Sequence, residues 1–272
     1  MNKLFSVKDK CVVVTGGAGI LCQQMVIDLA EAGARVCIVD HDKEHAETLA
    51  KSLVDKGYEA LALYADILDK GLVEETLTKT IEAFGKVDVL VNGAGGNRKD
   101  ATCSPPDTFF DIPDEAIKSV FDLNFIGSVL PSQVYGKHMA DNGEGVIINI
   151  SSMNAFRPLT NIAAYSAAKA AISNFTQWLS TYMAQRCSPR IRVNAIAPGF
   201  FLTNQNRFLL IDEKSGELTK RGQQIIDHTP MGEFGKPEDL TGVLMWLISD
   251  ASRFVTGIVV PVDGGFSAYS GV

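Results

Sequence analysis

A tyrosine and a lysine four positions apart are the residues of this chain whose chemistry is easiest to interpret. Tyr165 and Lys169 bound the sequence Tyr-Ser-Ala-Ala-Lys, and side chains four apart on a helix share a face, where a phenol and an ammonium can meet. A phenol has a pKa near ~10 in water, and a neighbouring cation lowers that pKa by favouring the phenolate. Tyr165 is therefore a candidate general acid and base, although a helix of this length can also carry such a pair by chance.

A glycine-rich turn near the N-terminus predicts a phosphate-binding site. Residues 11–15 form a short β-branched run, the glycine-rich residues 16–19 follow, and apolar positions continue with helical spacing as far as Gly33. This pattern indicates a strand, a turn and a helix. The unpaired N–H groups and the positive dipole end of that helix would lie beside a pyrophosphate. An ordinary tight loop is the alternative interpretation.

Asp40 ends the next predicted strand, residues 35–39, and lies 21 positions after Gly19. An acidic residue at about this spacing accepts a hydrogen bond from the ribose 2′-hydroxyl of NAD and would repel the 2′-phosphate of NADP. Positions 40–42 hold no arginine, so we expect NAD in preference to NADP, with Lys43 weakening that preference. A helix N-cap is the other role that fits Asp40.

Later strands bring polar residues to the same edge of a parallel sheet, where the ligands of such sheets bind. Predicted strands over 60–64, 87–91, 145–150 and 191–196 lead respectively to Asp66, to Asn92-Gly93-Ala94-Gly95-Gly96, to Ser151-Ser152 and to Pro198-Gly199. Asp66 would suit the amino group of adenine. The glycines after Asn92 would leave room for a cofactor.

Helices between these strands complete the pattern of a doubly wound α/β fold. They are predicted over 70–84, 113–140, 163–183 and 237–249, and a last strand is predicted over 257–262. One of them holds Asn124, an amide among apolar residues that needs hydrogen-bond partners if it is buried. Residues 200–237 exceed the length of an ordinary connection and are a candidate lid or substrate loop. We expect a single domain over residues 1–272 with a parallel sheet of about seven strands.

The composition is that of a globular protein, with 46% hydrophobic and 21% charged residues. A formal net charge of −7 attracts neither nucleic-acid backbones nor anionic membranes, so we expect no nucleic-acid partner and no membrane partner. Residues 1–10 carry charges and no apolar run. This start predicts neither a signal peptide nor a membrane span and favours a cytoplasmic protein.

Cysteines and histidines add little further chemistry. The cysteines are odd in number, lack CxxC spacing and have the pattern of reduced intracellular thiols with structural roles: Cys11, Cys22, Cys37, Cys103 and Cys187. His41 and His45 lie four apart beside two aspartates, a spacing that can bind a cation. A solvated helix start with acidic capping residues explains them better, so no metal site is predicted.

These motifs together resemble the short-chain dehydrogenase/reductase family over essentially the whole chain. The resemblance rests on the glycine turn after Thr15, Asp40, Asp66, residues 92–95, Asn124, Ser152 placed thirteen positions before Tyr165, Lys169, and Pro198-Gly199 with Thr203. It implies a Rossmann fold and an NAD-linked oxidoreductase acting on CH–OH groups. The cofactor-binding residues that it implies are Gly16, Gly17, Gly19, Ile20, Leu21, Asp40, Asp66, Ile67, Asn92, Gly93, Ala94, Tyr165, Lys169, Pro198, Gly199 and Thr203.

The same resemblance implies roles for four catalytic residues. Tyr165 would donate and accept the proton, and Ser152 would bind the reacting oxygen, with Ser151 as the alternative serine. Lys169 would lower the pKa of Tyr165 and hold the nicotinamide ribose, while Asn124 would support a proton relay. A homotetramer is also implied, with the helices around Asn124 and Tyr165 as interfaces.

Two departures from the family pattern fall in the expected cofactor site. The family usually has T-G-x-x-x-G-x-G, but Ile20 and Cys22 stand where the second and third glycines belong, and Gly19 comes one position early. The distance to Gly33 indicates substitution rather than deletion. Gly93 stands where the family often has the second asparagine of N-N-A-G. The first departure bears on the shape of the loop near the pyrophosphate.

Within this family, residues 16–22, 149–160, 198–207 and 262–272 resemble the D-mannonate oxidoreductase, or fructuronate reductase, group. That implies interconversion of D-mannonate and D-fructuronate in hexuronate catabolism. A sugar acid calls for a cation with planar donors and for several amides. The candidate substrate-binding residues are Ser152, Asn154, Arg157, Tyr165, Asn97, Arg98 and Arg207, with Arg157 as the first choice for the carboxylate.

Two other functions remain open at this point. A short-chain dehydrogenase/reductase acting on another ketone, such as a ketogluconate, a polyol-derived ketone or a 3-oxoacyl compound, would share the same scaffold, because substrate loops vary more than the fold. A non-catalytic NAD-binding protein would be expected to carry a decayed catalytic set. The set of Asn124, Ser152, Tyr165 and Lys169 is complete.

Overall fold

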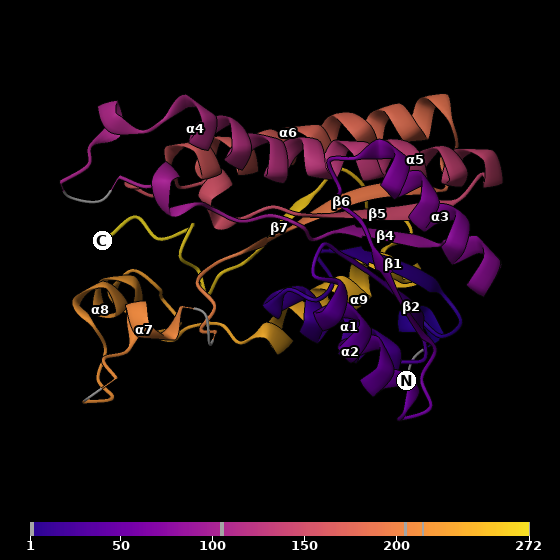
Figure 1. The fold of residues 1–272 in the computed structure, drawn as a ribbon, viewed down its shortest axis with the longest axis horizontal. Helices are drawn as coiled ribbons and strands as arrows, with labels where there is room; N and C mark the ends of the chain where they lie inside the picture. Colours follow the sequence, from indigo (N-terminus) through magenta and orange to yellow (C-terminus); the bar gives the residue numbers. More distant parts are fainter. Residues whose placement is uncertain (1–2, 104–105, 204–205, 214, 272) are drawn as a thin grey trace.

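The computed structural model describes residues 3–103, 106–203, 206–213 and 215–271 (Figure 1). Residues 204, 205 and 214 of the expected substrate loop, 200–237, lie outside the described residues. No helix of the described ranges is long and apolar enough to cross a membrane.

Seven parallel strands form one sheet in the order β3-β2-β1-β4-β5-β6-β7, which confirms the predicted fold class. The strands are β1 (Cys11–Thr15), β2 (Arg35–Asp40), β3 (Ala60–Tyr64), β4 (Val89–Asn92), β5 (Gly145–Ile150), β6 (Ile191–Pro198) and β7 (Val259–Val262). The central strands β1, β4, β5 and β6 are buried along their whole length because both faces of the sheet are covered. The strand order reverses between β1 and β4, and a ligand crevice forms at such a point, outside the carboxyl ends of the strands.

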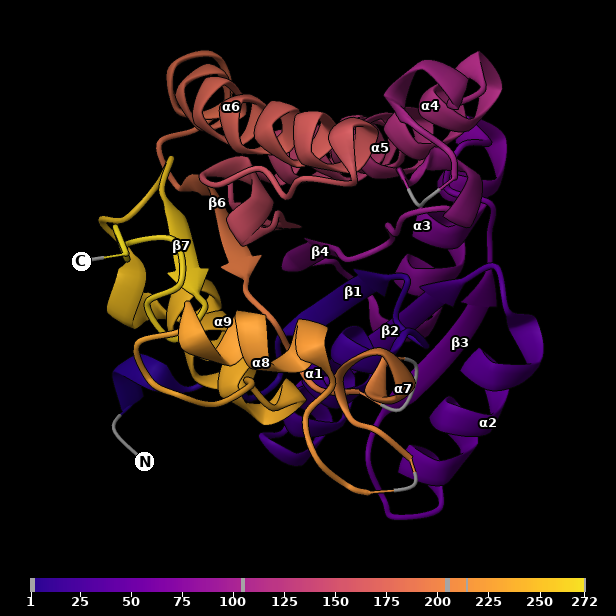
Figure 2. The ribbon, with the colours of Figure 1, turned by 90° about the vertical axis from the view of Figure 1, so that its left-hand side faces the viewer.

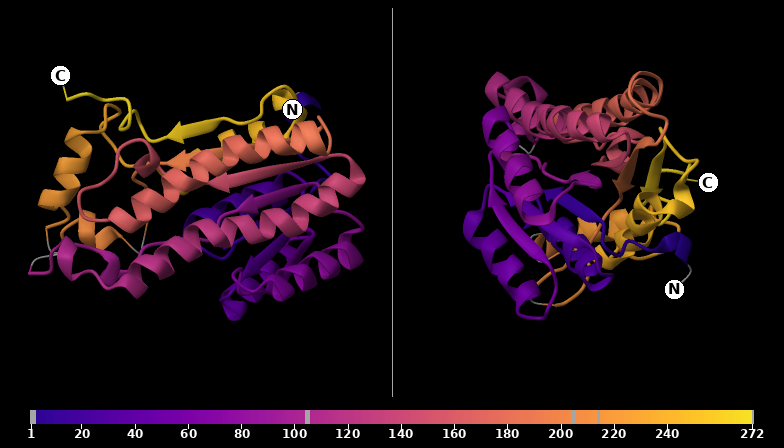
Figure 3. Two further views of the ribbon diagram at one scale, coloured as in Figure 1. Left: turned by 90° about the horizontal axis from the view of Figure 1, so that it is seen from above. Right: turned by 90° about the vertical axis from the view of Figure 1, so that its right-hand side faces the viewer.

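Helices cover both faces of this sheet (Figure 2). One layer holds α1 (Ile20–Glu31), α2 (Lys43–Val54) and α9 (Thr241–Ile248), and the other holds α3 (Lys70–Phe84), α4 (Asp114–Phe121), α5 (Gly127–Asn142) and α6 (Ala163–Arg186). Two short helices, α7 (Arg207–Leu210) and α8 (Lys220–Asp227), lie beyond the carboxyl ends of the strands (Figure 3). The sequence did not predict these two, because helices of one or two turns leave too few residues for a periodic pattern.

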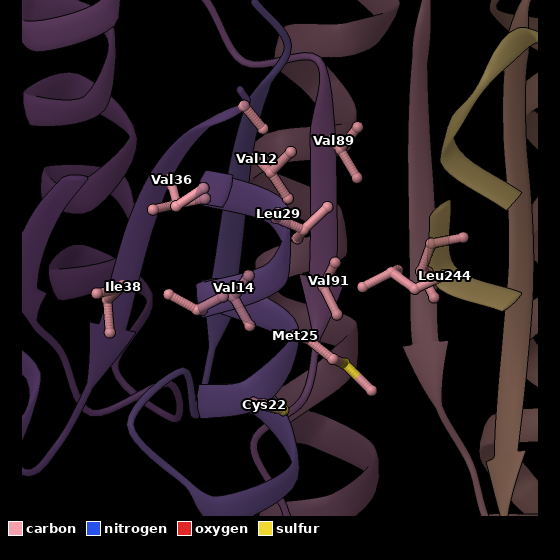
Figure 4. Packing of buried hydrophobic residues seen from close by; sticks show 14 of the residues in the cluster. Val12, Val14, Cys22, Met25, Leu29, Val36, Ile38, Val89, Val91 and Leu244 are labelled. Carbon is pink, nitrogen blue, oxygen red and sulfur yellow. The ribbon is translucent and has the colours of Figure 1, made fainter. Parts of the chain in front are cut away.

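Apolar packing holds α1 against β1. Successive side chains of a strand point to opposite faces, so that Val12 and Val14 of β1 join the core beneath α1 while Val13 joins the other core. Figure 4 shows Val12 and Val14 in the same cluster as Met25 and Leu29 of α1. Because this packing holds α1 against β1, the glycine turn between them lies at the edge of the sheet.

The helix predicted over 113–140 is continuous but not uniform. A π-helical turn, Asp122–Ile126, joins α4 to α5. Such turns interrupt the regular hydrogen-bond ladder and are frequent at functional sites. Asn124 lies inside this turn and is fully buried, so its amide groups must be satisfied within the protein.

Candidate active site

A cleft of about 730 Å³ lies at the carboxyl ends of the strands, where the strand order reverses. Its walls come from the turn after β1, the residues at the ends of β2, β4, β5 and β6, and the first turns of α1 and α6. The predicted residues that line it are Gly16, Gly19, Ile20, Leu21, Asp40, Asp66, Ile67, Gly93, Ala94, Ser152, Tyr165, Lys169, Pro198, Gly199 and Thr203. The strand ends therefore bring together residues that are far apart in the sequence.

Asp40 is held rigidly at one end of the cleft. Its carboxylate is 5% exposed; Oδ2 accepts the backbone N–H of Ala18 at 3.0 Å and Oδ1 accepts that of Asp42 at 3.0 Å. The N-cap of α2 is Asp42, which accepts the N–H of His45. Asp40 is thus not a helix cap, and its charge remains directed at the part of the cleft next to the glycine turn.

The glycine turn fits a dinucleotide through its backbone. Gly16 has a φ of +63°, and a Cβ there would lie 2.6 Å from the Cα of Ala94, so that only glycine fits. Helix α1 begins at Ile20, and its N-cap, Gly19, provides no side-chain cap. The N–H groups of the first turn therefore have no partner within the helix and can meet a phosphate despite the substitutions at Ile20 and Cys22.

Two predicted cofactor-binding residues lie behind the cleft rather than in its wall. Gly17 is buried, and a Cβ there would approach the Val14 carbonyl oxygen to 2.8 Å. Asn92 is also buried, and its amide donates to Ser132 Oγ at 2.9 Å and to Asn149 Oδ1 at 2.8 Å. Direct contact of either residue with a cofactor remains a prediction. Their geometry supports the turn and the end of β4.

Asn124 is hydrogen-bonded to the backbone that follows β4. Its Nδ2 donates to the carbonyls of Gly96 and Val120, both at 2.7 Å, and its Oδ1 accepts the N–H of Gly96 at 3.2 Å. A Cβ at Gly95 would lie 2.7 Å from Asn124 Oδ1 and 3.2 Å from Lys169 Nζ. Asn124 and Lys169 therefore both approach the backbone at Gly95, where a larger residue would not fit.

Tyr165 and Lys169 meet in the cleft, where the Lys169 ammonium lies over the face of the Tyr165 ring rather than against the phenolic oxygen. Lys169 is 4% exposed, donates to the carbonyl of Ile150 at 2.8 Å, and places Nζ 5.5 Å from the centre of the Tyr165 ring. Burial lowers the pKa of Lys169 to about 8. Burial raises the pKa of Tyr165, and a hydrogen bond with Ser152 opposes that rise. That Lys169 lowers the pKa of Tyr165 remains a prediction.

The two serines after β5 have different environments. The hydroxyl of Ser151 donates to the carbonyl of Lys169 at 3.1 Å and lies 2.8 Å from Ser173 Oγ, so it fastens the strand to α6. The hydroxyl of Ser152 accepts the N–H of Asn154 at 3.2 Å and interacts with Tyr165. This geometry favours Ser152 over Ser151 as the partner of the reacting oxygen.

The cleft also has lining residues that the sequence did not indicate as site residues. They include Ala18, His41, His45, Leu123, Phe200, Phe201 and Asn206. Asn206 orders the wall beyond β6, because its Oδ1 accepts the N–H of Thr203 at 2.8 Å and its Nδ2 donates to the carbonyl of Phe201 at 2.7 Å. For Phe200, Phe201 and Asn206, the position shortly after Pro198-Gly199 was the available signal.

None of the predicted substrate cations lines the cleft in this structure. Arg98 pairs with Asp100 at 2.7 Å, Arg157 donates from Nε to the carbonyl of Ser267 at 3.1 Å, and Arg207 is exposed at the start of α7. The two predicted amides are also absent from its wall: Asn97 donates to Thr102 Oγ1 at 2.9 Å, and Asn154 is buried, with no partner for its Oδ1 among the described residues. Substrate binding by these five residues remains a prediction.

A metal centre finds no support in the described part of the chain. It holds no group of three or more His, Cys, Asp or Glu side chains that could bind a metal ion. His41 instead lies 3.1 Å from Asp40 Oδ1, with its ring 86% exposed.

Comparison with known proteins gives one family. The model of the family described as "short chain dehydrogenase" matches residues 10–214. A Bacillus subtilis (strain 168) protein, "Uncharacterized oxidoreductase UxuB", is 47% identical over 97% of this chain and 96% of its own length. The "2-dehydro-3-deoxy-D-gluconate 5-dehydrogenase" of Dickeya dadantii (strain 3937) is 35% identical over 97% of this chain and 98% of its own.

A solved structure agrees with these sequence matches. It is a Haemophilus influenza protein named "putative D-Mannonate oxidoreductase" with bound NAD, and it is 45% identical to this chain. The two superpose with a TM-score of 0.92, covering 98% of each chain. The fold described above is therefore shared with a protein that binds a nicotinamide dinucleotide.

Proposed function

The chain belongs to the short chain dehydrogenase family, an oxidoreductase family that uses a nicotinamide cofactor, and we propose that it interconverts D-mannonate and D-fructuronate with NAD(H). The observation that carries the proposed chemistry is the meeting of Ser152, Tyr165 and Lys169 in one cleft. A phenol, a hydroxyl and a buried ammonium at one point can move a proton to and from a substrate oxygen.

The side chains divide the proton chemistry among them. A bound nicotinamide would supply or accept the hydride at the substrate carbon. Tyr165 gives its phenolic proton to the carbonyl oxygen in reduction and takes it back in oxidation, while the Ser152 hydroxyl hydrogen-bonds to the same oxygen. Lys169 would hold the ribose of the bound cofactor through its ammonium group. Asn124 fixes Gly96 and thereby the wall beside Lys169.

Preference for NAD over NADP is proposed on the basis of Asp40. Its carboxylate is buried and fixed by two backbone N–H groups, so it cannot turn away from a 2′-phosphate. Like charges brought together in a partly desolvated site cost several kcal/mol. A ribose 2′-hydroxyl can instead donate to the carboxylate.

A sugar acid is the proposed substrate because of two relatives. The Haemophilus influenza protein carries D-mannonate in its name, and the Dickeya dadantii protein is named for a deoxygluconate. Of the described residues that line the cleft, Lys169 is the only lysine or arginine. Arg207 follows the lining residue Asn206 directly, and we assign the substrate carboxylate to it in preference to Arg157. Because the described cleft lining holds so few cations, a neutral polyol is the alternative substrate.

We also propose that the protein is a cytoplasmic homotetramer of single-domain subunits. Support comes from stacked aromatic rings along α6, where Trp178 and Tyr182 are 57% and 46% exposed and their ring centres lie 5.3 Å apart. Phe175 stacks on Trp178 at 6.2 Å. A second subunit would bury this apolar surface.

Replacement of the phenol tests the chemistry. Tyr165→Phe should lower turnover by about 10³-fold, because general acid–base catalysis contributes roughly 10²–10⁴-fold, while the dissociation constant for NADH stays within about twofold. Turnover near the wild-type value would refute the mechanism. D-fructuronate, 5-ketogluconate and a 3-oxoacyl ester should be assayed side by side with NADH; an inactive D-fructuronate reaction would refute the substrate while leaving the oxidoreductase intact.

A further inference from the structure

We propose that Cys22 is a positioning residue for the bound dinucleotide, because its thiol fixes the spacing between the start of α1 and the end of β4. Cys22 is 5% exposed in the first turn of α1 and lines the cleft. A Cβ built at Gly93, the first residue after β4, would overlap the Cys22 sulfur. The thiol thus occupies the space that a side chain at position 93 would need.

The contact between Cys22 and Gly93 joins two parts of the cleft, and a bound dinucleotide must touch both of them. Helix α1 would present its N-terminal N–H groups to the phosphates of a bound dinucleotide, and the backbone after β4 forms the opposite wall beside Lys169. The N–H of Gly93 also donates to the carbonyl of Thr15 at 3.1 Å and to Thr15 Oγ1 at 3.2 Å. Hydrogen bonds therefore hold Gly93 to β1, and the Cys22 sulfur packs against it from α1.

Two departures from the expected sequence pattern thereby explain each other. Cys22 stands where a glycine is expected, and Gly93 stands where a larger residue is common. The structure places one directly against the other. Burial raises the pKa of Cys22 to about 12, so the thiol remains neutral and acts through its volume.

The test is a double-mutant cycle on the full-length protein, with NADH affinity measured by nicotinamide fluorescence. Gly93→Ala should weaken NADH binding by about 30-fold, because overpacking a closed site is costly. Adding Cys22→Gly should recover about tenfold of that loss. Complete recovery is not expected, because a methyl group at position 93 would also lie 2.8 Å from the Thr15 carbonyl oxygen. A double variant that binds NADH no better than Gly93→Ala would overturn the proposal.

Thermal unfolding of the same four proteins separates positioning from folding. The coupling between the two substitutions should be larger in NADH affinity than in the free energy of unfolding; equal coupling in both would assign the contact to folding alone and overturn the proposal. Gly242→Ala, in α9 with no atom within 4 Å of an added Cβ, is the control for an extra methyl group. The inference rests on the proposed cofactor: a wild-type protein that does not bind NADH would refute that proposal, whereas failed recovery in a binding protein would refute only the role of Cys22.

Discussion

The two ends of the cleft differ in what holds their side chains. At the nucleotide end, Asp40 is fixed by two backbone N–H groups and Gly16 is pressed against Ala94. At the substrate end, the expected cation Arg157 is exposed and bonded to Ser267, outside the cleft. The shape of the nucleotide end is therefore fixed by backbone geometry. The cations expected at the substrate end are instead long side chains on connecting segments.

The largest effect should come from the nucleotide end, where the backbone has no freedom. Gly16→Ala should weaken NADH binding by about 100-fold, because a residue with a Cβ is strained at a φ of +63° and its methyl would lie 2.6 Å from Ala94 Cα; the two costs sum to roughly 3 kcal/mol. Fluorescence titration with NADH measures the change.

A matched glycine provides the control for that substitution. Gly57 has a φ of +88° in the turn after α2, with no atom within 4 Å of an added Cβ. Gly57→Ala therefore introduces the backbone strain without the overlap, and NADH affinity should stay within about twofold. Equal losses in the two variants would show that the Gly16 contact does not shape the cofactor site.

The next largest effect concerns the choice of dinucleotide. Asp40→Asn removes the fixed charge, and the ratio of NADPH to NADH dissociation constants should fall by about 30-fold, since unfavourable charge contacts cost several kcal/mol. Competition with NADH fluorescence measures both affinities. Asp42→Asn is the control, because asparagine also caps a helix; a shift of the same size in that variant would assign the preference to general charge rather than to Asp40.

Most of the fold could be predicted because its signals are local. Four strand or helix ranges, 11–15, 60–64, 145–150 and 70–84, agree with the structure residue for residue. Buried parallel strands are unbroken apolar runs, and long amphipathic helices repeat a pattern several times. Helices α7 and α8 escaped prediction because each is too short to repeat one.

The site was predictable to the extent that strand ends locate it. Asp40 ends β2, and Asp66 and Ser152 lie two residues after β3 and β5, so sheet topology alone brings them to one edge. Whether a side chain then faces the cleft depends on packing that a single sequence does not encode locally. Asn92 follows the same rule and yet turns into the core, because Ser132 and Asn149 accept its amide hydrogens.

A pH titration should change the NADH dissociation constant about fivefold through Lys169, where the two ends of the cleft meet. Burial lowers the pKa of Lys169 from its ordinary 10.5 to about 8, so its charge is lost as the pH rises through about 8. If the ammonium holds the cofactor, the dissociation constant of NADH should rise about fivefold between pH 8 and pH 9, as linkage to one proton with a pKa of about 8 requires. Lys169→Met should bind weakly and without this dependence.

Stability should change in the opposite direction over the same pH window. Between about pH 8 and 10.5 the unfolded chain binds a proton at Lys169 that the folded protein does not, so this group makes the free energy of unfolding rise with pH. The stability of the unliganded wild type relative to Lys169→Met should therefore increase across that window. If the difference in free energy of unfolding between the two proteins did not depend on pH, the pKa of Lys169 would not be lowered in the folded state.

The smallest effect should come from Arg157 at the substrate end, and it tests the comparison most directly. Arg157→Gln should change the KM for the sugar acid by less than about twofold, because the guanidinium is exposed and its Nε contact lies outside the cleft and exposed charges contribute little. Arg207→Gln, one residue beyond the lining Asn206, should raise that KM by about tenfold, since charge-assisted hydrogen bonds to a carboxylate contribute about 1.5 kcal/mol or more. If Arg157→Gln instead gave the larger increase, the substrate would bind against the segment after Ser152. The substrate end would then be rearranged when the sugar acid is bound.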